Sequence, residues 1–145
     1  INELRNIGRP VVLVFFGDHQ PSIAAALNDE LYPQEDTASH AFRIHQSTYF
    51  VWANYEIAGN TELNVYDTVG ANEIAAIALN KIGAPLSDYQ KALLATRSDV
   101  PTINVAGYLG ADGLRYDLES EDSPYTSTID KLRRVQYLEF ATKVQ

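Results

Sequence analysis

The architecture follows from one run of residues, Pro10-Val11-Val12-Leu13-Val14-Phe15-Phe16-Gly17-Asp18-His19-Gln20-Pro21. From Val11 to Phe16 every residue is apolar, without the alternation of a half-exposed strand, which is typical of a strand covered on both faces in a parallel sheet. Gly17 and Pro21 end the strand, because glycine allows a sharp exit and proline cannot continue a ladder. In open α/β sheets ligands bind beyond the carboxyl ends of such strands, so the exit is a candidate site.

Asp18 and His19 lie at this exit and are the candidate metal ligands. Adjacent side chains of a strand point to opposite faces, so both can bind one ion only where the chain leaves the extended form. A carboxylate oxygen with a neutral imidazole nitrogen suits zinc, manganese or iron better than calcium or magnesium. The dipeptide alone leaves an alternative open, a turn in which Asp18 caps the next segment and His19 is a half-exposed loop residue.

Four parts of the chain resemble one family in the same order. Val12 to Ser22 resembles the GDH-x-P segment of the sulfatase-like phosphoglycerol transferases, the lipoteichoic acid synthase family within the alkaline phosphatase superfamily. Thr48 to Tyr55 resembles the next core strand of that family, and Val69 to Tyr89 resembles the helix, loop and helix that follow. Leu132 to Tyr137 is similar to its terminal segment.

The resemblance implies that residues 1–145 are a single piece, the C-terminal segment of a larger sulfatase-like catalytic domain. Its implied fold is α/β, a mainly parallel sheet flanked by helices. Asp18 and His19 would complete a divalent metal site, with manganese as the expected ion and zinc or magnesium as alternatives. The nucleophilic threonine, an acidic ligand and a substrate-binding histidine of the family match no segment here, so no catalytic residue is assigned and His40 and His45 receive no such role.

The implied activity is transfer of a phosphoglycerol or phosphoethanolamine group from a membrane phospholipid to a glycan or glycerol acceptor, for building or modifying the cell envelope. A metal-activated hydroxyl would attack the phosphodiester, and an acceptor hydroxyl would resolve the covalent phospho-enzyme. The resemblance places the parent protein at the extracellular face of a bacterial membrane, anchored by preceding helices, and the isolated segment would be inactive. Two alternatives stay open: a sulfatase or another phosphatase-superfamily hydrolase, and a non-catalytic interaction domain.

Composition narrows the class of protein. The 145 residues are 46% hydrophobic and 21% charged, which is ordinary for a globular domain. A net charge of -8 argues against nucleic-acid binding, which needs clustered lysine and arginine. The absence of cysteine excludes disulfides and thiolate metal sites, and no apolar run approaches the roughly 20 residues of a membrane span, so we expect a water-soluble segment. The acidic run Asp117–Asp122 lacks the spacing of a calcium loop and is interpreted as a solvated loop.

Local patterns predict the remaining elements. Ser87 and Gln90 form a capping-box pattern at a helix start, and Gly83 with Pro85 ends the helix before it. Asn54 would support the metal ligands from behind if its strand ran parallel to the first, and Trp52 is interpreted as core. We expect an exposed sheet edge or helix face to make the segment self-associate. The predicted helices are Glu3–Ile7, Gln20–Tyr32, Ile74–Ile82, Ser87–Ala95 and Ile129–Ala141; the predicted strands are Ser47–Tyr55 and Thr102–Ala106; Gln34–His40 and Gly107–Gly113 are predicted as a loop and a turn.

Overall fold

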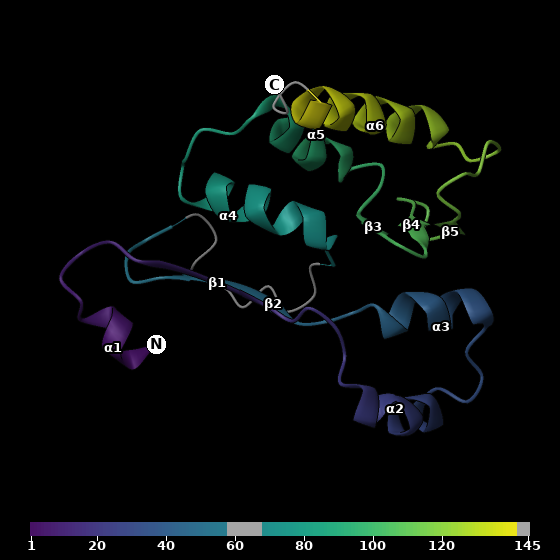
Figure 1. Ribbon diagram of the computed structural model, residues 1–145, viewed down its shortest axis with the longest axis horizontal. Helices are drawn as coiled ribbons and strands as arrows, with labels where there is room; N and C mark the ends of the chain where they lie inside the picture. Colours follow the sequence, from purple (N-terminus) through teal and green to yellow (C-terminus); the bar gives the residue numbers. More distant parts are fainter. Residues whose placement is uncertain (58–67, 142–145) are drawn as a thin grey trace. The chain divides into compact units, whose positions relative to one another are not determined.

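The computed structural model describes residues 1–57 and 68–141. The chain divides into two compact units, Ile1–Leu63 and Asn64–Gln145, and each is described by itself. Both combine helices with short strands, as the sequence predicted (Figure 1). Within the described ranges, no helix combines the length and the apolar character needed to cross a membrane.

The first unit is a two-stranded ribbon joined by helices. Its elements are α1 (Asn2–Arg5), β1 (Val12–Phe16), the 3-10 turn η1 (Ser22–Ala24), α2 (Ala25–Leu31), α3 (Thr37–Ile44) and β2 (Tyr49–Ala53). The chain leaves β1, runs out along α2 and returns along α3 into β2 (Figure 1). The rings of Phe15 and Phe50 stack across the ribbon with their centroids 5.1 Å apart.

The two strands of this ribbon pair antiparallel, from Val12 opposite Ala53 to Phe16 opposite Tyr49. We expected a mainly parallel sheet. The described strands instead form two sheets, and the strand pairs in both are antiparallel. The reason lies in the connection, because a parallel partner requires a crossover back to the start of the first strand. Here α2 and α3 form a helical hairpin that returns the chain to the end of β1 that it left.

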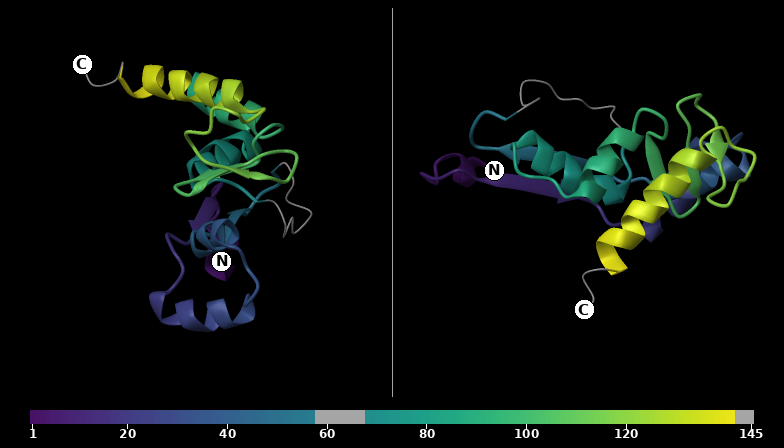
Figure 2. Two further views of the ribbon diagram at one scale, coloured as in Figure 1. Left: turned by 90° about the vertical axis from the view of Figure 1, so that its right-hand side faces the viewer. Right: turned by 90° about the horizontal axis from the view of Figure 1, so that it is seen from above.

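The second unit holds most of the buried core. Its elements are η2 (Ala71–Glu73), α4 (Ile74–Lys81), α5 (Asp88–Thr96), β3 (Thr102–Asn104), β4 (Gly107–Leu109), β5 (Arg115–Tyr116) and α6 (Thr126–Ala141). The three strands form an antiparallel meander, and α6 lies alongside α5 (Figure 1 and Figure 2). Val100, Tyr108 and Ile129 form the centre of this core.

Most of the predicted elements are present, with altered boundaries. The capping box is confirmed, since Gln90 N donates to Ser87 Oγ over 3.2 Å and Ser87 N donates to Gln90 Oε1 over 2.9 Å. The loop predicted at Gln34–His40 is wrong in its second half, where α3 begins because Asp36 accepts a hydrogen bond from Ser39 N. The turn predicted at Gly107–Gly113 begins with β4, and α6 starts three residues earlier than predicted.

Candidate functional site

The end of β1 is the part of the structure that delivers Asp18 and His19. Gly17 N donates to Thr48 O over 3.0 Å, which holds the strand exit against the start of β2. A Cβ at Gly17 would lie 1.9 Å from Ser47 Oγ and 3.2 Å from Ser47 Cβ. Only glycine therefore fits here without moving Ser47, and the turn that carries Asp18 and His19 starts from a closely packed point.

The two side chains are brought together immediately after this point. Asp18 Oδ1 accepts a hydrogen bond from His19 N over 2.9 Å. Asp18 Oδ2 lies 3.5 Å from His19 Nε2, and the side chains are 83% and 74% exposed. The two side chains therefore lie close enough to reach one ion, which a regular strand would not allow for adjacent residues.

The other ring nitrogen of His19 decides what Nε2 can do. His19 Nδ1 lies 2.8 Å from the backbone carbonyl oxygen of Gln20. A carbonyl oxygen can only accept, so Nδ1 carries the proton in this contact, and in the neutral ring Nε2 then presents a lone pair. Nε2 lies 3.5 Å from Asp18 Oδ2, and two acceptors this close repel each other unless a proton or a cation lies between them.

The separation of these atoms suits two ligands of one ion. Ligands about 2.0–2.2 Å from a tetrahedral ion lie about 3.3–3.6 Å apart, and the observed Nε2 to Oδ2 distance is 3.5 Å. An octahedral ion needs its neighbouring ligands about 3 Å apart, which a small rotation of either exposed side chain supplies. Within residues 1–57 and 68–141, no group of three or more histidine or acidic side chains is arranged to hold a metal. The pair is thus a partial donor set.

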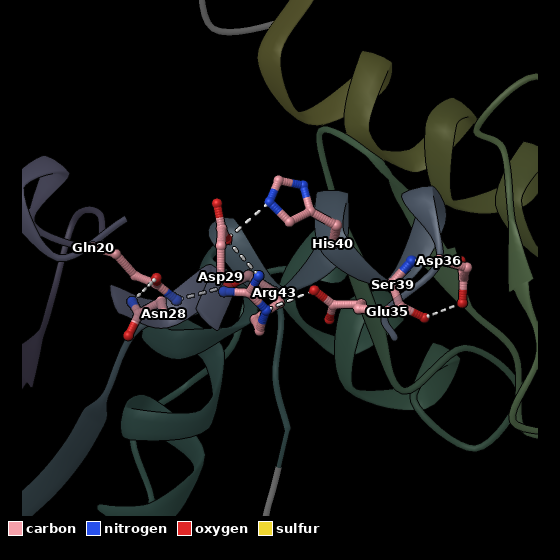
Figure 3. A network of polar contacts seen from close by, with 8 residues as sticks. All are labelled: Gln20, Asn28, Asp29, Glu35, Asp36, Ser39, His40 and Arg43. Atoms are coloured by element: carbon pink, nitrogen blue, oxygen red, sulfur yellow. Dashed lines mark hydrogen bonds and ion pairs between the residues drawn. The ribbon is translucent and has the colours of Figure 1, made fainter. Parts of the chain in front are cut away.

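A second polar cluster, which sequence reasoning missed, ties α2 to α3 (Figure 3). Arg43 donates through Nε to Glu35 over 2.7 Å and through a terminal nitrogen to Asp29 over 2.8 Å. Its guanidinium lies 4.7 Å from the centre of the Tyr32 ring. Hydrogen bonds to Asp29 and Glu35 raise the pKa of Arg43, and the same bond to Arg43 lowers the pKa of Asp29.

The histidines of this region do not join Asp18 and His19. His40 lies in the first half of α3, and its Nε2 is 3.1 Å from Asp29 Oδ1 of α2. His45 follows the end of α3. The signal that was overlooked is the Asp36 cap, which starts a helix at Thr37 and places His40 and Arg43 one turn apart on one face. The sequence predicted each of them as a surface or strand-start histidine: His45 is exposed and the His40 side chain is 43% exposed, and neither begins a strand.

Asn54 is a correction to the expected site. It was a candidate support for Asp18 and His19 only if β1 and β2 were parallel, and the antiparallel register puts it opposite Val11, at the other end of β1. Asn54 Oδ1 accepts from Val11 N over 2.8 Å, and Nδ2 donates to Leu4 O over 3.1 Å and to Arg9 O over 2.9 Å. Its side chain therefore fastens the segment before β1 and has no part in the candidate site.

The acidic run keeps its structural interpretation. Asp117 accepts a hydrogen bond from Glu119 N over 2.9 Å, and Glu119 pairs with Arg133 of α6 over 2.8 Å. Two of the four carboxylates of this run therefore have hydrogen-bond partners within the chain.

No family model, no curated protein and no solved structure matches this chain. The candidate function rests on the residues and geometry described above.

Proposed function

We propose that this chain supplies two ligands, Asp18 and His19, to the divalent metal site of a phosphoglycerol transferase of the sulfatase-like type. The observation that carries the proposal is the 3.5 Å separation of Asp18 Oδ2 and His19 Nε2 with His19 Nδ1 already bonded to a carbonyl. This arrangement supports the proposal, because it leaves two exposed atoms that can donate lone pairs within reach of one ion. Manganese is the proposed ion, with zinc or magnesium as alternatives.

The residues of this chain orient the site. Gly17 sets where β1 ends against Ser47, and the Gln20 carbonyl orients the imidazole so that Nε2 is the coordinating nitrogen. A bound divalent ion would lower the pKa of a hydroxyl nucleophile and neutralise charge on the transferred phosphoryl group. The nucleophile and the remaining ligands are proposed to come from elsewhere in the parent protein.

Charge supports a metal as the source of positive field. The proposed substrate is a phospholipid-derived phosphodiester, transferred to a glycan or glycerol acceptor, whereas the chain carries a net charge of -8. The arginine in this part of the first unit, Arg43, is engaged by Asp29 and Glu35 and is only 11% exposed. An anionic substrate near Asp18 therefore needs a cation that this arginine does not supply.

The finer fold and the location belong to the same proposal. The chain would be the C-terminal portion of an alkaline-phosphatase-like domain at the extracellular face of a bacterial membrane. An antiparallel pair is compatible with that expectation, because large α/β sheets often carry antiparallel strands beside parallel ones.

Reading the native gene on the 5′ side of the Ile1 codon tests the proposal. We expect codons for apolar helices, then for an acidic residue at a strand end and a threonine nucleophile. A cysteine or serine in the place of that threonine, in a setting for conversion to formylglycine, would shift the assignment to a sulfatase. A start codon directly before Ile1 would refute the enzyme assignment and leave a small interaction domain.

The purified 145-residue chain gives a second test. We expect no turnover of a phosphodiester such as a soluble phosphoglycerol ester, because no more than two ligands are assigned within it. Turnover that is abolished in Asp18→Ala would contradict the assignment of nucleophile and further ligands to other parts of the parent protein.

A further inference from the structure

Gln20, the residue after the two proposed ligands, is bonded through both its backbone and its side chain. Its carbonyl oxygen accepts from His19 Nδ1, so the orientation of the imidazole depends on where this carbonyl points. Pro21 follows and disfavours the helical conformation at Gln20, which narrows the directions open to the carbonyl. Whatever holds Gln20 in place therefore holds His19.

The side-chain amide of Gln20 is held at both ends, by two different helices (Figure 3). Gln20 Nε2 donates to the backbone carbonyl of Arg43, in the last turn of α3, over 2.7 Å. Asn28 Nδ2, in α2, donates to Gln20 Oε1 over 3.0 Å. Because a carbonyl only accepts, the amide cannot be turned over without losing the bond to Arg43, so its orientation is unique.

The anchor on α3 is itself fixed. The Arg43 side chain is 11% exposed and lies between the carboxylates of Glu35 and Asp29, with its guanidinium near the Tyr32 ring. Both bonds of the Gln20 amide thus lead to the helical hairpin, whose two helices are tied to each other by charged hydrogen bonds. Such bonds are among the stronger ones in proteins and hold their geometry well.

We infer that Gln20 is a positioning residue for the metal site, which fixes the His19 imidazole with Nε2 available by tying the ligand turn to the α2–α3 hairpin. This inference rests on the proposed function, which supplies the metal ion that the imidazole would bind. It adds a residue that acts through His19 and is not itself a proposed ligand. Groups that bond the second nitrogen of a ligating histidine typically change metal affinity 10- to 100-fold when lost.

The test compares Gln20→Met with a matched control, Gln34→Met, in the 145-residue chain. Gln34 is exposed in the same unit, so it undergoes the same chemical change away from the ligand turn. The first readout is the tautomer of His19 from its ring 15N shifts in metal-free protein at about pH 8, above the usual histidine pKa. The second is the Mn²⁺ dissociation constant from electron paramagnetic resonance of free Mn²⁺.

We expect wild type and Gln34→Met to show the Nδ1-protonated tautomer and equal Mn²⁺ affinity. In Gln20→Met we expect averaged ring shifts and about a tenfold weaker affinity. Asn28→Ala removes one of the two amide bonds without touching Gln20 and should give a smaller change of the same sign. It also carries the test if the amide spectrum shows that Gln20→Met disturbs the folding of the first unit.

The two proposals fail in different ways. Unchanged His19 shifts and unchanged Mn²⁺ affinity in Gln20→Met would overturn the positioning role while leaving the metal site intact. Mn²⁺ binding that is the same in wild type and in Asp18→Ala, with His19 shifts that still change in Gln20→Met, would overturn the proposed function and support the positioning of the imidazole.

Discussion

Replacing Gly17 with alanine should destabilise the first unit at the end of β1. The new methyl group would lie 1.9 Å from Ser47 Oγ and 3.2 Å from Ser47 Cβ. The hydroxyl can rotate away, but the Cβ of Ser47 cannot, and the bond from Gly17 N to Thr48 O prevents the strands from separating freely. The substitution therefore forces either an unfavourable side-chain conformation or a longer backbone hydrogen bond.

The size of the effect follows from these contacts. A strained side-chain torsion costs about 0.5–1.5 kcal/mol, and overpacking a closely fitted position costs about 1–3 kcal/mol. We expect Gly17→Ala to lower the free energy of unfolding of the first unit by about 1–2 kcal/mol, since only part of the clash persists once the hydroxyl has rotated. Substituting Ser47→Gly in the same chain removes both clashing atoms, so the two changes should be coupled by about 1 kcal/mol.

Urea unfolding followed by Trp52 fluorescence measures this directly. Trp52 is the single tryptophan of the sequence and lies opposite Leu13 in the ribbon, so it reports on the first unit. The double variant Gly17→Ala/Ser47→Gly should be more stable than the sum of the single variants predicts. A Gly17→Ala protein as stable as wild type, or single effects that simply add, would refute the close packing of Gly17 against Ser47.

The remaining predictions concern other contacts. Asn54→Ala should destabilise the first unit by about 2–3 kcal/mol, because three hydrogen bonds of about 1 kcal/mol each are lost. The Mn²⁺ affinity should stay unchanged. A changed affinity with unchanged stability would mean that Asn54 belongs to the metal site. The hydrogen bond to Asp112 raises the pKa of Tyr116 to about 12, so the stability that it contributes should be present below about pH 10 and lost as the pH rises through about 12. In an ultraviolet phenolate titration, Tyr116→Phe should remove a tyrosine step near pH 12, and an unaltered step there would contradict this. The same bond lowers the pKa of Asp112, so its contribution should be lost only in acid, below the usual value of 3.8. Ile23 is 93% exposed and Leu27 60% exposed on one helical stripe, so the chain should self-associate in sedimentation at high concentration and Ile23→Glu/Leu27→Glu should weaken this; a monomer at all concentrations would count against it.

Features set by neighbours along the chain could be predicted from the sequence. The Ser87–Gln90 capping box and the end of α4 just before Gly83, whose φ is +69°, depend on residues a few positions apart. The strands β1 and β2 were also predicted, because apolar β-formers dominate both segments. The sequence also indicated how Asp18 and His19 could come close together. The flanking glycine and proline allow the chain to leave the extended form there, and only then can adjacent side chains approach one point.

Features set by partners far along the chain were missed. An all-apolar run does not reveal which strand lies beside it or in which direction, and the return of the chain depends on a helix that starts at the overlooked Asp36 cap. The wrong strand direction then misplaced Asn54, whose partners Leu4, Arg9 and Val11 are more than 40 residues away in sequence. The role of Arg43 likewise depends on carboxylates of two other segments, and no short motif encodes them.

The most direct test of the central claim is a titration of the 15N-labelled chain with Mn²⁺, in which paramagnetic broadening locates the bound ion. The chain contains 19 acidic residues, so the position of the broadening is informative. We predict that the amide signals of Asp18, His19 and Gln20 broaden first and that Asp18→Ala abolishes this. Broadening that begins at the acidic run Asp117–Asp122, or that is the same in Asp18→Ala, would contradict a metal site at the end of β1.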